Sequence, residues 1–203
     1  MITVHTFGDS HASGEYSHWN DIKISGINIV CNYRGPKLMY SFGKLKKKLL
    51  NIKDFGVQEN DIVIFCYGEI DCRNHVHKHI NKYFSYVDVI DKLVINYFRA
   101  IKENVRQFDN IKVCVYNVVP PTRFIETNDD YPFIGTNEER KTYTLYMNKK
   151  LKEYCKKLKY NFFDIYNFSC DKDGFLKKNI SDGNVHLVNS NYSSLMIKKI
   201  SLL

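Results

Sequence analysis

Several features that divide or redirect a fold are scarce in this chain. Its 203 residues include only four prolines and ten glycines, and these do not gather into a stretch that would link separate domains. The sequence shows no internal repeat and no low-complexity segment. Because 44% of the residues are hydrophobic, the chain can build a sizeable core. We therefore expect one domain over residues 1–203.

Targeting and metal-binding patterns are also missing. The amino terminus has no basic segment followed by an apolar stretch and a cleavage site, and no apolar run approaches the ~18 residues that span a bilayer. The six cysteines show no zinc-site spacing and are expected to be reduced thiols. The histidine run from His75 to His79 lacks the cysteines or carboxylates that would complete a metal site. These absences predict a soluble, cytoplasmic protein without a membrane segment or a bound metal.

The charge of the chain is strongly positive but says little about its partners. The formal net charge is +8 at pH 7, and most of the positive charge comes from lysine. Alanine occurs only at Ala12 and Ala100, while Asn, Ile and Tyr are abundant, which is the amino-acid bias of an AT-rich genome. Such a bias places lysine on any solvated surface, and the lysine clusters fall in helical patterns that predict exposed faces. We therefore expect no nucleic-acid partner.

Hydrophobic periodicity predicts the secondary structure. Runs rich in Val, Ile, Phe or Tyr predict strands over residues 2–7, 27–33, 61–67, 111–118 and 162–166. Amphipathic patterns predict helices over residues 44–51, 87–108, 137–158 and 189–202, and the irregular stretch 120–135 predicts a long loop. Strands that alternate with helices imply right-handed crossovers and a mostly parallel sheet. We therefore expect a three-layer α/β/α fold with a flavodoxin-like central sheet of about five strands.

Two polar motifs lie at positions that a parallel sheet brings together. Gly8-Asp9-Ser10-His11 follows the first predicted strand, and Asp182-Gly183-Asn184-Val185-His186 precedes the last predicted helix. A serine hydroxyl is a poor nucleophile until a base removes its proton, and His186 is the best-placed base for Ser10. The imidazole needs a carboxylate that fixes its tautomer, which Asp182 can supply. The alternatives for that carboxylate are Asp9, Asp171 and Asp173.

The order and placement of these motifs resemble the SGNH/GDSL hydrolase superfamily over nearly the whole chain. Here His11 follows the serine, which makes the motif a GDSH variant. The resemblance implies a three-layer α/β/α fold and the cleavage or transfer of acyl esters, with no metal and no dissociable cofactor. It also implies that Ser10 is the nucleophile, that His186 is the general base and that Asp182 orients it. The spacing from Asp182 to His186 is one residue longer than the usual Asp-x-x-His.

The resemblance also implies an oxyanion hole, for which the match is poorer. The backbone N–H of Ser10 is one donor. A glycine after the second strand is another, for which we choose Gly43, with Gly35 as the competitor. The third is an asparagine in a Gly-x-Asn-Asp segment after the third strand. Gly68 and Asp71 fit this segment, but Ile70 stands in place of the asparagine. One lost donor typically costs about 3 to 4 kcal/mol of transition-state stabilisation.

Polar residues near these motifs are candidates for binding the substrate. Arg73, Asn74 or His75 could replace the missing donor, and the guanidinium of Arg73 could instead hold an anionic group of the substrate. The aromatic ring of Tyr16 is expected to border the substrate. The candidates for substrate binding are Arg73, Asn74, His75 and His11.

The favoured function is hydrolysis of a small acyl group, such as acetyl, from a carbohydrate or a similar hydroxylated substrate through an acyl-enzyme on Ser10. The expected partner is therefore a small acylated molecule such as a glycan ester. Two alternatives stay open. The same three side chains could transfer the acyl group to a glycan hydroxyl, as in an O-acyltransferase, if the pocket excludes water. A noncatalytic module for glycan or nucleic acid would use the same cleft without forming an acyl-enzyme.

Overall fold

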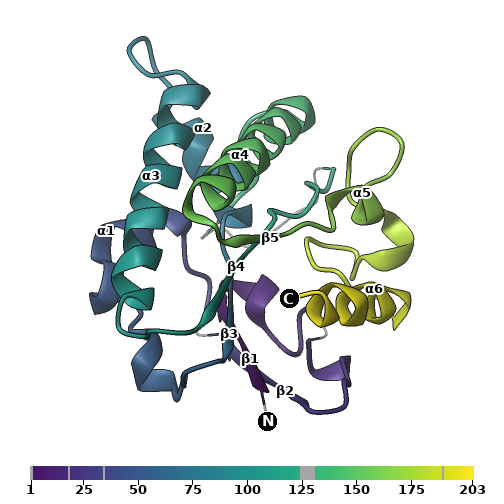
Figure 1. The fold of residues 1–203 in the computed structure, drawn as a ribbon. Coiled ribbons are helices and arrows are strands. Elements are labelled where there is room, and N and C mark those ends of the chain that lie inside the picture. The colour runs from purple at the N-terminus through teal and green to yellow at the C-terminus, as the bar shows by residue number, and fades with distance from the viewer. Residues whose placement is uncertain (1, 18, 34, 124–130, 189) are drawn as a thin grey trace.

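The central feature of the computed structural model is a five-stranded parallel sheet (Figure 1). The structure describes residues 2–17, 19–33, 35–123, 131–188 and 190–203. The strands are β1 (Ile2–Gly8), β2 (Ile27–Tyr33), β3 (Ile62–Cys66), β4 (Lys112–Tyr116) and β5 (Asn161–Phe163). Their order is β2-β1-β3-β4-β5, and every neighbouring pair is parallel. This is the flavodoxin-like order, so the predicted fold class is confirmed.

Helices cover both faces of the sheet. They are α1 (Met39–Leu45), α2 (Val76–His79), α3 (Tyr86–Val105), α4 (Asn137–Leu158), α5 (Tyr166–Ser169) and α6 (Ser190–Ser201). In Figure 1, α1, α3 and α4 lie on one side of the strands, and α5 and α6 lie on the other. Shorter turns are the 3₁₀ segments η1 (Ser10–Ala12), η2 (Trp19–Asp21), η3 (Lys46–Lys48), η4 (Ile52–Phe55) and η6 (Lys178–Ile180), and the π-helical η5 (Asp71–His75).

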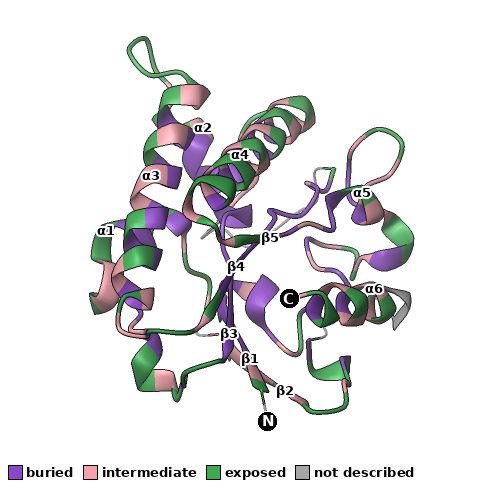
Figure 2. Ribbon diagram, viewed as in Figure 1, coloured by how far each residue is buried: buried purple, intermediate pink, exposed green. Residues whose placement is uncertain are grey.

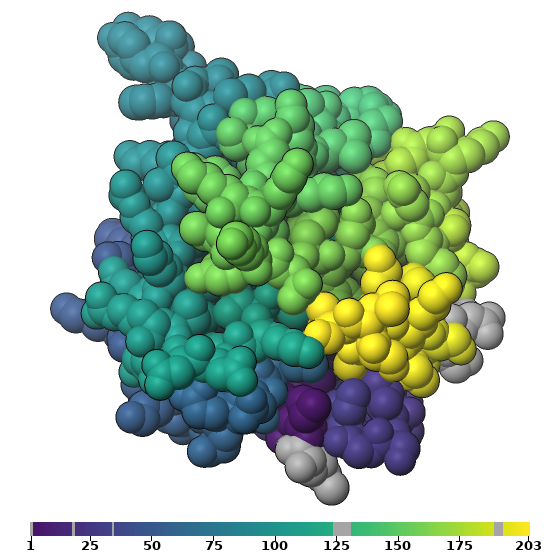
Figure 3. All heavy atoms as spheres, viewed as in Figure 1, coloured from purple at the N-terminus to yellow at the C-terminus, as the bar shows by residue number. Residues whose placement is uncertain are grey.

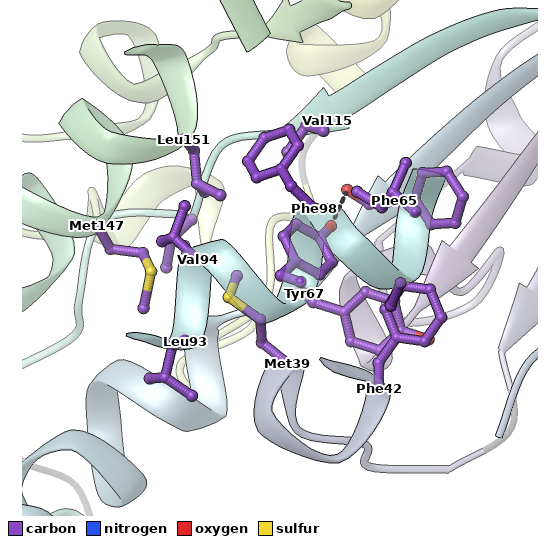
Figure 4. Close-up of a cluster of buried hydrophobic side chains, with 14 of the residues drawn as sticks. Met39, Phe42, Phe65, Tyr67, Leu93, Val94, Phe98, Val115, Met147 and Leu151 are labelled. Carbon is purple, nitrogen blue, oxygen red and sulfur yellow. Dashed lines mark hydrogen bonds between the residues drawn. The ribbon is translucent and has the colours of Figure 1, made fainter. Parts of the chain in front are cut away.

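Each face of the sheet has its own apolar core. Along β3, Val63 and Phe65 face the core under α1, α3 and α4, while Ile64 faces the opposite core. All of β3 is buried, as a strand covered on both faces must be (Figure 2). In the first core, the ring of Phe42 from α1 stacks on Phe65 and Tyr67, with centroids 5.9 and 5.2 Å apart (Figure 4). These contacts fix α1 beside the carboxyl end of β3.

The long helices begin where the sequence predicts. Thr136 caps α4: its Oγ1 accepts the Glu139 amide at 3.2 Å, and Glu139 Oε2 accepts the Thr136 amide at 2.7 Å. A second capping box, made by Ser85 and Asp88, begins α3. The predicted helices 87–108, 137–158 and 189–202 therefore correspond to α3, α4 and α6. Of the predicted loop 120–135, residues 124–130 lie outside the described residues.

The predicted helix over residues 44–51 is wrong. The helix α1 begins five residues earlier, at Met39, and only a short 3₁₀ turn follows it. Met39 and Phe42 are fully buried and supply its apolar face. Its first amides are held by the Asp71 carboxylate, which accepts Met39 N at 2.6 Å and Tyr40 N at 3.1 Å. A cap from a residue so distant in sequence leaves no local signal.

The last predicted strand, over residues 162–166, ends too late. β5 ends at Phe163, and α5 begins at Tyr166. Asp164 Oδ1 accepts the Tyr166 amide at 3.0 Å, and Asn117 Oδ1 accepts the Ile165 amide at 2.8 Å. The Asn117 side chain thus takes the Ile165 amide that a longer strand would donate to β4, and the Asp164 side chain starts the turn into α5.

The space-filling view shows a segment that projects from the molecule between α2 and α3 (Figure 3). It carries Tyr83 and Phe84, which are 75% and 55% exposed. Over the described residues, no helix is both long and apolar enough to cross a membrane.

Candidate active site

The serine motif lies where β1 approaches β3 very closely. A Cβ atom on Gly8 would lie 1.8 Å from the carbonyl oxygen of Cys66, so only glycine fits here. The Asp9 amide donates to the same carbonyl at 3.1 Å. Asp9 then caps η1, because its Oδ1 accepts the His11 amide at 3.0 Å. This exit places Ser10 at the first position of η1, at the carboxyl edge of the sheet.

His186 lies in a closed turn that precedes α6. The flanks of the turn form an antiparallel bridge, and the Asp182 amide donates to the His186 carbonyl at 3.2 Å. Gly183 has φ +87°, a left-handed conformation that glycine adopts without steric cost. Asp182 Oδ1 accepts the amides of Asn184 and His186 at 2.7 and 3.3 Å. The turn therefore accommodates the longer spacing and keeps the Asp182 and His186 side chains adjacent.

These two segments meet in one hydrogen-bonded chain. Ser10 Oγ lies 2.8 Å from His186 Nε2, and His186 Nδ1 lies 2.6 Å from Asp182 Oδ2. The His186 and Asp182 side chains are 13% and 29% exposed, so solvent reaches them although they are partly desolvated. The structure brings together the three side chains that the sequence predicts as nucleophile, base and orienting acid.

The other carboxylates considered for the imidazole have different partners. Asp171 and Asp173 pair with Arg123 at 2.7 and 3.0 Å. Asp9 Oδ1 lies 2.9 Å from Nδ1 of His11. Of these four carboxylates, Asp182 is therefore the one that forms a hydrogen bond with the His186 ring.

Burial and nearby charges set the protonation states of His186 and Asp182. Burial lowers the pKa of His186 and the nearby His11 lowers it further, although Asp182 acts in the opposite direction. Burial alone would raise the pKa of Asp182, but hydrogen bonds from His186 and the Asn184 amide lower it below its ordinary value. Near neutral pH the pair is an ionised carboxylate and a neutral imidazole. The imidazole Nδ1–H donates to Asp182, which leaves Nε2 free to accept the proton of Ser10.

Two neighbours of the serine differ in their access to solvent. Tyr16 is 45% exposed, and its ring centroid lies 5.2 Å from that of His186, so it lies beside the candidate site. His11 is only 4% exposed and binds Asp9 and the Val185 carbonyl. The buried ring of His11 is not placed to contact a substrate, contrary to the prediction.

The predicted oxyanion glycines lie in different places. Gly43 is inside α1, where a Cβ atom would lie 3.1 Å from Asn96 Cβ of α3. Close helix packing therefore explains Gly43, and the structure does not place it beside Ser10. Gly68 follows β3 with φ +117°, and a Cβ atom there would lie 2.8 Å from Val118. Gly35, the alternative to Gly43, has φ +81° and lies in the open turn after β2.

The segment after Ile70 binds other parts of the protein. Ile70 itself is buried. Arg73 forms a two-pronged ion pair with Glu69, at 2.8 and 3.1 Å, and donates to the Tyr131 carbonyl. Asn74 Nδ2 donates to the Pro132 carbonyl at 3.0 Å. These contacts fasten residues 131–132 to η5, so the predicted substrate contacts of Arg73 and Asn74 are replaced by structural ones.

His75 lies on the other side of η5. Its ring centroid is 4.5 Å from that of Tyr40 and 4.2 Å from that of His79. Burial lowers the pKa of His75 to about 4, so the ring is neutral near pH 7. His75 therefore packs against α1 rather than the serine, contrary to the prediction. Within the described part of the chain, no group of three or more His, Cys, Asp or Glu side chains is arranged to hold a metal ion.

We expect Asp71→Ala to lower the free energy of unfolding by about 2 to 4 kcal/mol, because two amides at the start of α1 lose their acceptor in a buried site. The carboxylate is fully buried and binds Met39 N and Tyr40 N. Urea denaturation measures the change. The aspartate of the α3 capping box gives a matched control, since Asp88 is exposed and Asp88→Ala should destabilise the protein much less. Equal losses for the two variants would contradict the role of Asp71.

Comparison with known proteins shows which solved structures share this fold. No protein-family model and no curated protein matches the chain. Among solved structures it resembles a GDSL-like lipase from Bacteroides thetaiotaomicron, with 17% identity over 98% of this chain and 86% of that one and a TM-score of 0.64. It also resembles an M. smegmatis aryl esterase, with 12% identity over 100% of both chains and a TM-score of 0.66.

A third similar structure is an acetyl xylan esterase, with 16% identity over 99% of this chain and 98% of that one and a TM-score of 0.60. At these identities the likeness establishes the fold alone. The chain has an SGNH-like fold, and its structural neighbours are GDSL-like lipases and esterases.

Proposed function

We propose that this chain is an SGNH-type serine esterase of the GDSH variant, which removes a small acyl group through an acyl-enzyme on Ser10. The observation that carries the proposal is the pair of hydrogen bonds that connects Ser10 Oγ to His186 and His186 to Asp182, at 2.8 and 2.6 Å. A serine hydroxyl bonded to a neutral imidazole that a carboxylate orients is the arrangement that acyl transfer to serine requires. The esterases and lipases among the structural neighbours support the same class.

The reaction follows from these contacts in two halves. Ser10 Oγ attacks the ester carbonyl while its proton passes to His186 Nε2, and Asp182 stabilises the imidazolium that forms. The ester C–O bond then breaks, and the imidazolium gives its proton to the leaving alcohol, so the acyl group stays on Ser10. In the second half, water gives a proton to His186 and attacks the acyl carbonyl. The carboxylic acid leaves, and Ser10 regains its proton from His186.

The oxyanion hole of the proposed site has few donors. Ser10 is the first residue of η1, where a helix leaves N–H groups without an intrahelical partner, so we assign its amide as one donor. Gly68, at the carboxyl end of β3, is our candidate for the second. Ile70 offers no polar side chain, and Gly43 packs against α3 instead. We therefore expect a lower turnover than a complete hole would give, by the cost of one donor.

We propose an acetylated, hydroxylated ring such as a sugar ester as the substrate. Tyr16 presents a half-exposed aromatic ring beside His186, on which a sugar ring could stack next to the reacting ester. The acetyl xylan esterase among the structural neighbours supports a carbohydrate substrate.

The proposal predicts that the purified protein hydrolyses p-nitrophenyl acetate and reacts with a fluorophosphonate probe. The probe forms a stable adduct only with an activated serine, so intact-mass analysis should show one probe per chain and peptide mapping should place it on Ser10. Acetate release from an acetylated xylo-oligosaccharide tests the substrate class.

A folded protein that neither hydrolyses the acetate nor reacts with the probe would contradict the proposed function. Acetyl transfer to an added sugar in place of hydrolysis would identify an O-acyltransferase.

A further inference from the structure

His11, the residue after Ser10, belongs to a second hydrogen-bonded chain that the proposed mechanism does not use. Its Nδ1 lies 2.9 Å from Asp9 Oδ1, and its Nε2 lies 3.2 Å from the carbonyl oxygen of Val185. His11 and Asp9 are 4% and 1% exposed. These buried hydrogen bonds therefore connect Asp9, through His11, to Val185, the residue before His186.

Both partners of the His11 ring are hydrogen-bond acceptors. A carboxylate oxygen and a carbonyl oxygen cannot donate, so each contact needs an N–H on the ring. A neutral imidazole has one N–H, whereas an imidazolium has two. The geometry therefore favours a positively charged His11. Burial is the largest single effect and opposes this charge, but the Asp9 carboxylate, Glu69 and the Val185 carbonyl together raise the pKa of His11 above its ordinary value.

The backbone around His11 is held from several directions. The Trp19 indole Nε1 donates to the His11 carbonyl at 2.8 Å, and Trp19 is fully buried. Thr6 Oγ1 donates to the Ala12 carbonyl at 2.6 Å. Because its backbone is held in this way, the His11 ring has a fixed position from which it binds the Val185 carbonyl.

We propose that His11 is a positioning residue, a buried imidazolium that binds the Val185 carbonyl, fixes the turn that presents His186 to Ser10, and keeps His186 unprotonated by its charge. The inference rests on the proposed function of Ser10 and His186. The ring centroids of His11 and His186 are 5.6 Å apart. A unit charge at that distance shifts a titration by roughly 0.5 to 2 pH units, depending on the local dielectric.

Other titratable groups surround the two rings. Around His11 they include Glu69, whose negative charge favours the imidazolium. Cys66 and Tyr67 also lie beside Asp9 and His11, and burial raises the pKa of both, so they stay neutral near pH 7. Around His186 the charged groups are Asp182, Glu69 and His11. Of these three, only His11 lowers the pKa of His186, so its removal has a definite sign.

The test compares His11→Gln with a matched control, His5→Gln. His5 is a second buried histidine of the same segment, 3.3 Å from the Asp61 carboxylate at the other end of β1. In the wild type, neutral His186 is the active form and its pKa is lowered, so the acid limb of kcat/KM for p-nitrophenyl acetate should lie below pH 6.5. We expect His11→Gln to move this limb upward by roughly 0.5 to 2 pH units, and His5→Gln to leave it in place.

The positioning role predicts a second change. Without its partner for Val185, the turn loosens, so kcat should fall about 10- to 100-fold while KM stays within about twofold. An acid limb that does not move in His11→Gln, or a loss confined to KM, would overturn the proposal.

A measurement on the wild type does not depend on activity or on the folding of a variant. Nitrogen-15 NMR of the histidine side chains at pH 6.5 should show His11 mainly with both ring nitrogens protonated and His186 mainly neutral. A neutral His11 would overturn the proposal even in an active enzyme. A charged His11 in a protein that does not react with the fluorophosphonate probe would locate the failure in the proposed function instead.

Discussion

Ser10→Ala is expected to lower kcat for p-nitrophenyl acetate by about 10⁴- to 10⁶-fold, the range typical of removing a serine nucleophile. Without Oγ no acyl-enzyme can form, and only substrate binding and the oxyanion donors remain. His186→Ala should have a similar effect, because Ser10 Oγ loses the base that lies 2.8 Å away. Since the two residues act as a unit, the double variant should be no slower than either single one.

Steady-state kinetics and fluorophosphonate labelling of the same preparations measure these losses, and circular dichroism checks the fold. Ser25→Ala and His79→Ala are matched controls, because both residues are exposed. Turnover within tenfold of the wild type in a folded Ser10→Ala protein would contradict the assignment of the nucleophile. Loss of activity in the controls would mean that the assay reports stability rather than chemistry.

Gly8→Ala is expected to abolish folding, or to lower the free energy of unfolding by about 4 kcal/mol or more. The added Cβ would lie 1.8 Å from the Cys66 carbonyl oxygen, which belongs to the backbone of β3 and cannot rotate away. β1 and β3 would have to separate where Gly8 pairs with Cys66, and the Asp9 amide would lose its acceptor. A loss of this size is a large share of the stability of a typical domain.

Soluble yield and urea denaturation followed by Trp19 fluorescence measure this effect. Gly26→Ala is the control: Gly26 has φ +77°, but a Cβ atom there would meet nothing within 4 Å. The control should therefore cost only the left-handed backbone penalty, about 1 to 2 kcal/mol. Equal unfolding midpoints for the two variants would show that the close approach at Gly8 does not constrain the fold.

The features that the sequence predicts well are those with a local physical signal. The apolar stripe of α3 and the Thr136–Glu139 capping box of α4 each lie within one continuous segment. The alternation of strands and helices then limits the sheet to parallel topologies. The start of α1 has no such signal, because its amides bind Asp71, which is 31 residues away from Tyr40.

The candidate site shows the same division. Ser10, Asp182 and His186 could be predicted because strand ends in a parallel sheet share one edge and because each residue lies in a motif with turn residues. Arg73 could not be placed from the sequence, since its cationic side chain suits a substrate anion and Glu69 equally well. Gly43 misled because a glycine near a helix start serves either a close helix contact or an exposed amide, and here the contact with α3 explains it.

The proposed nucleophile and the proposed base are attached to the protein in different ways. Ser10 directly follows an inner strand of the sheet, whereas His186 and Asp182 share one closed turn between η6 and α6. A movement of that turn therefore carries imidazole and carboxylate together, and their mutual geometry survives it. Such a movement changes the distance between Ser10 Oγ and His186 Nε2. In the proposed enzyme, the position of this turn therefore sets how closely the base approaches the serine, while the acid–base pair itself stays unchanged.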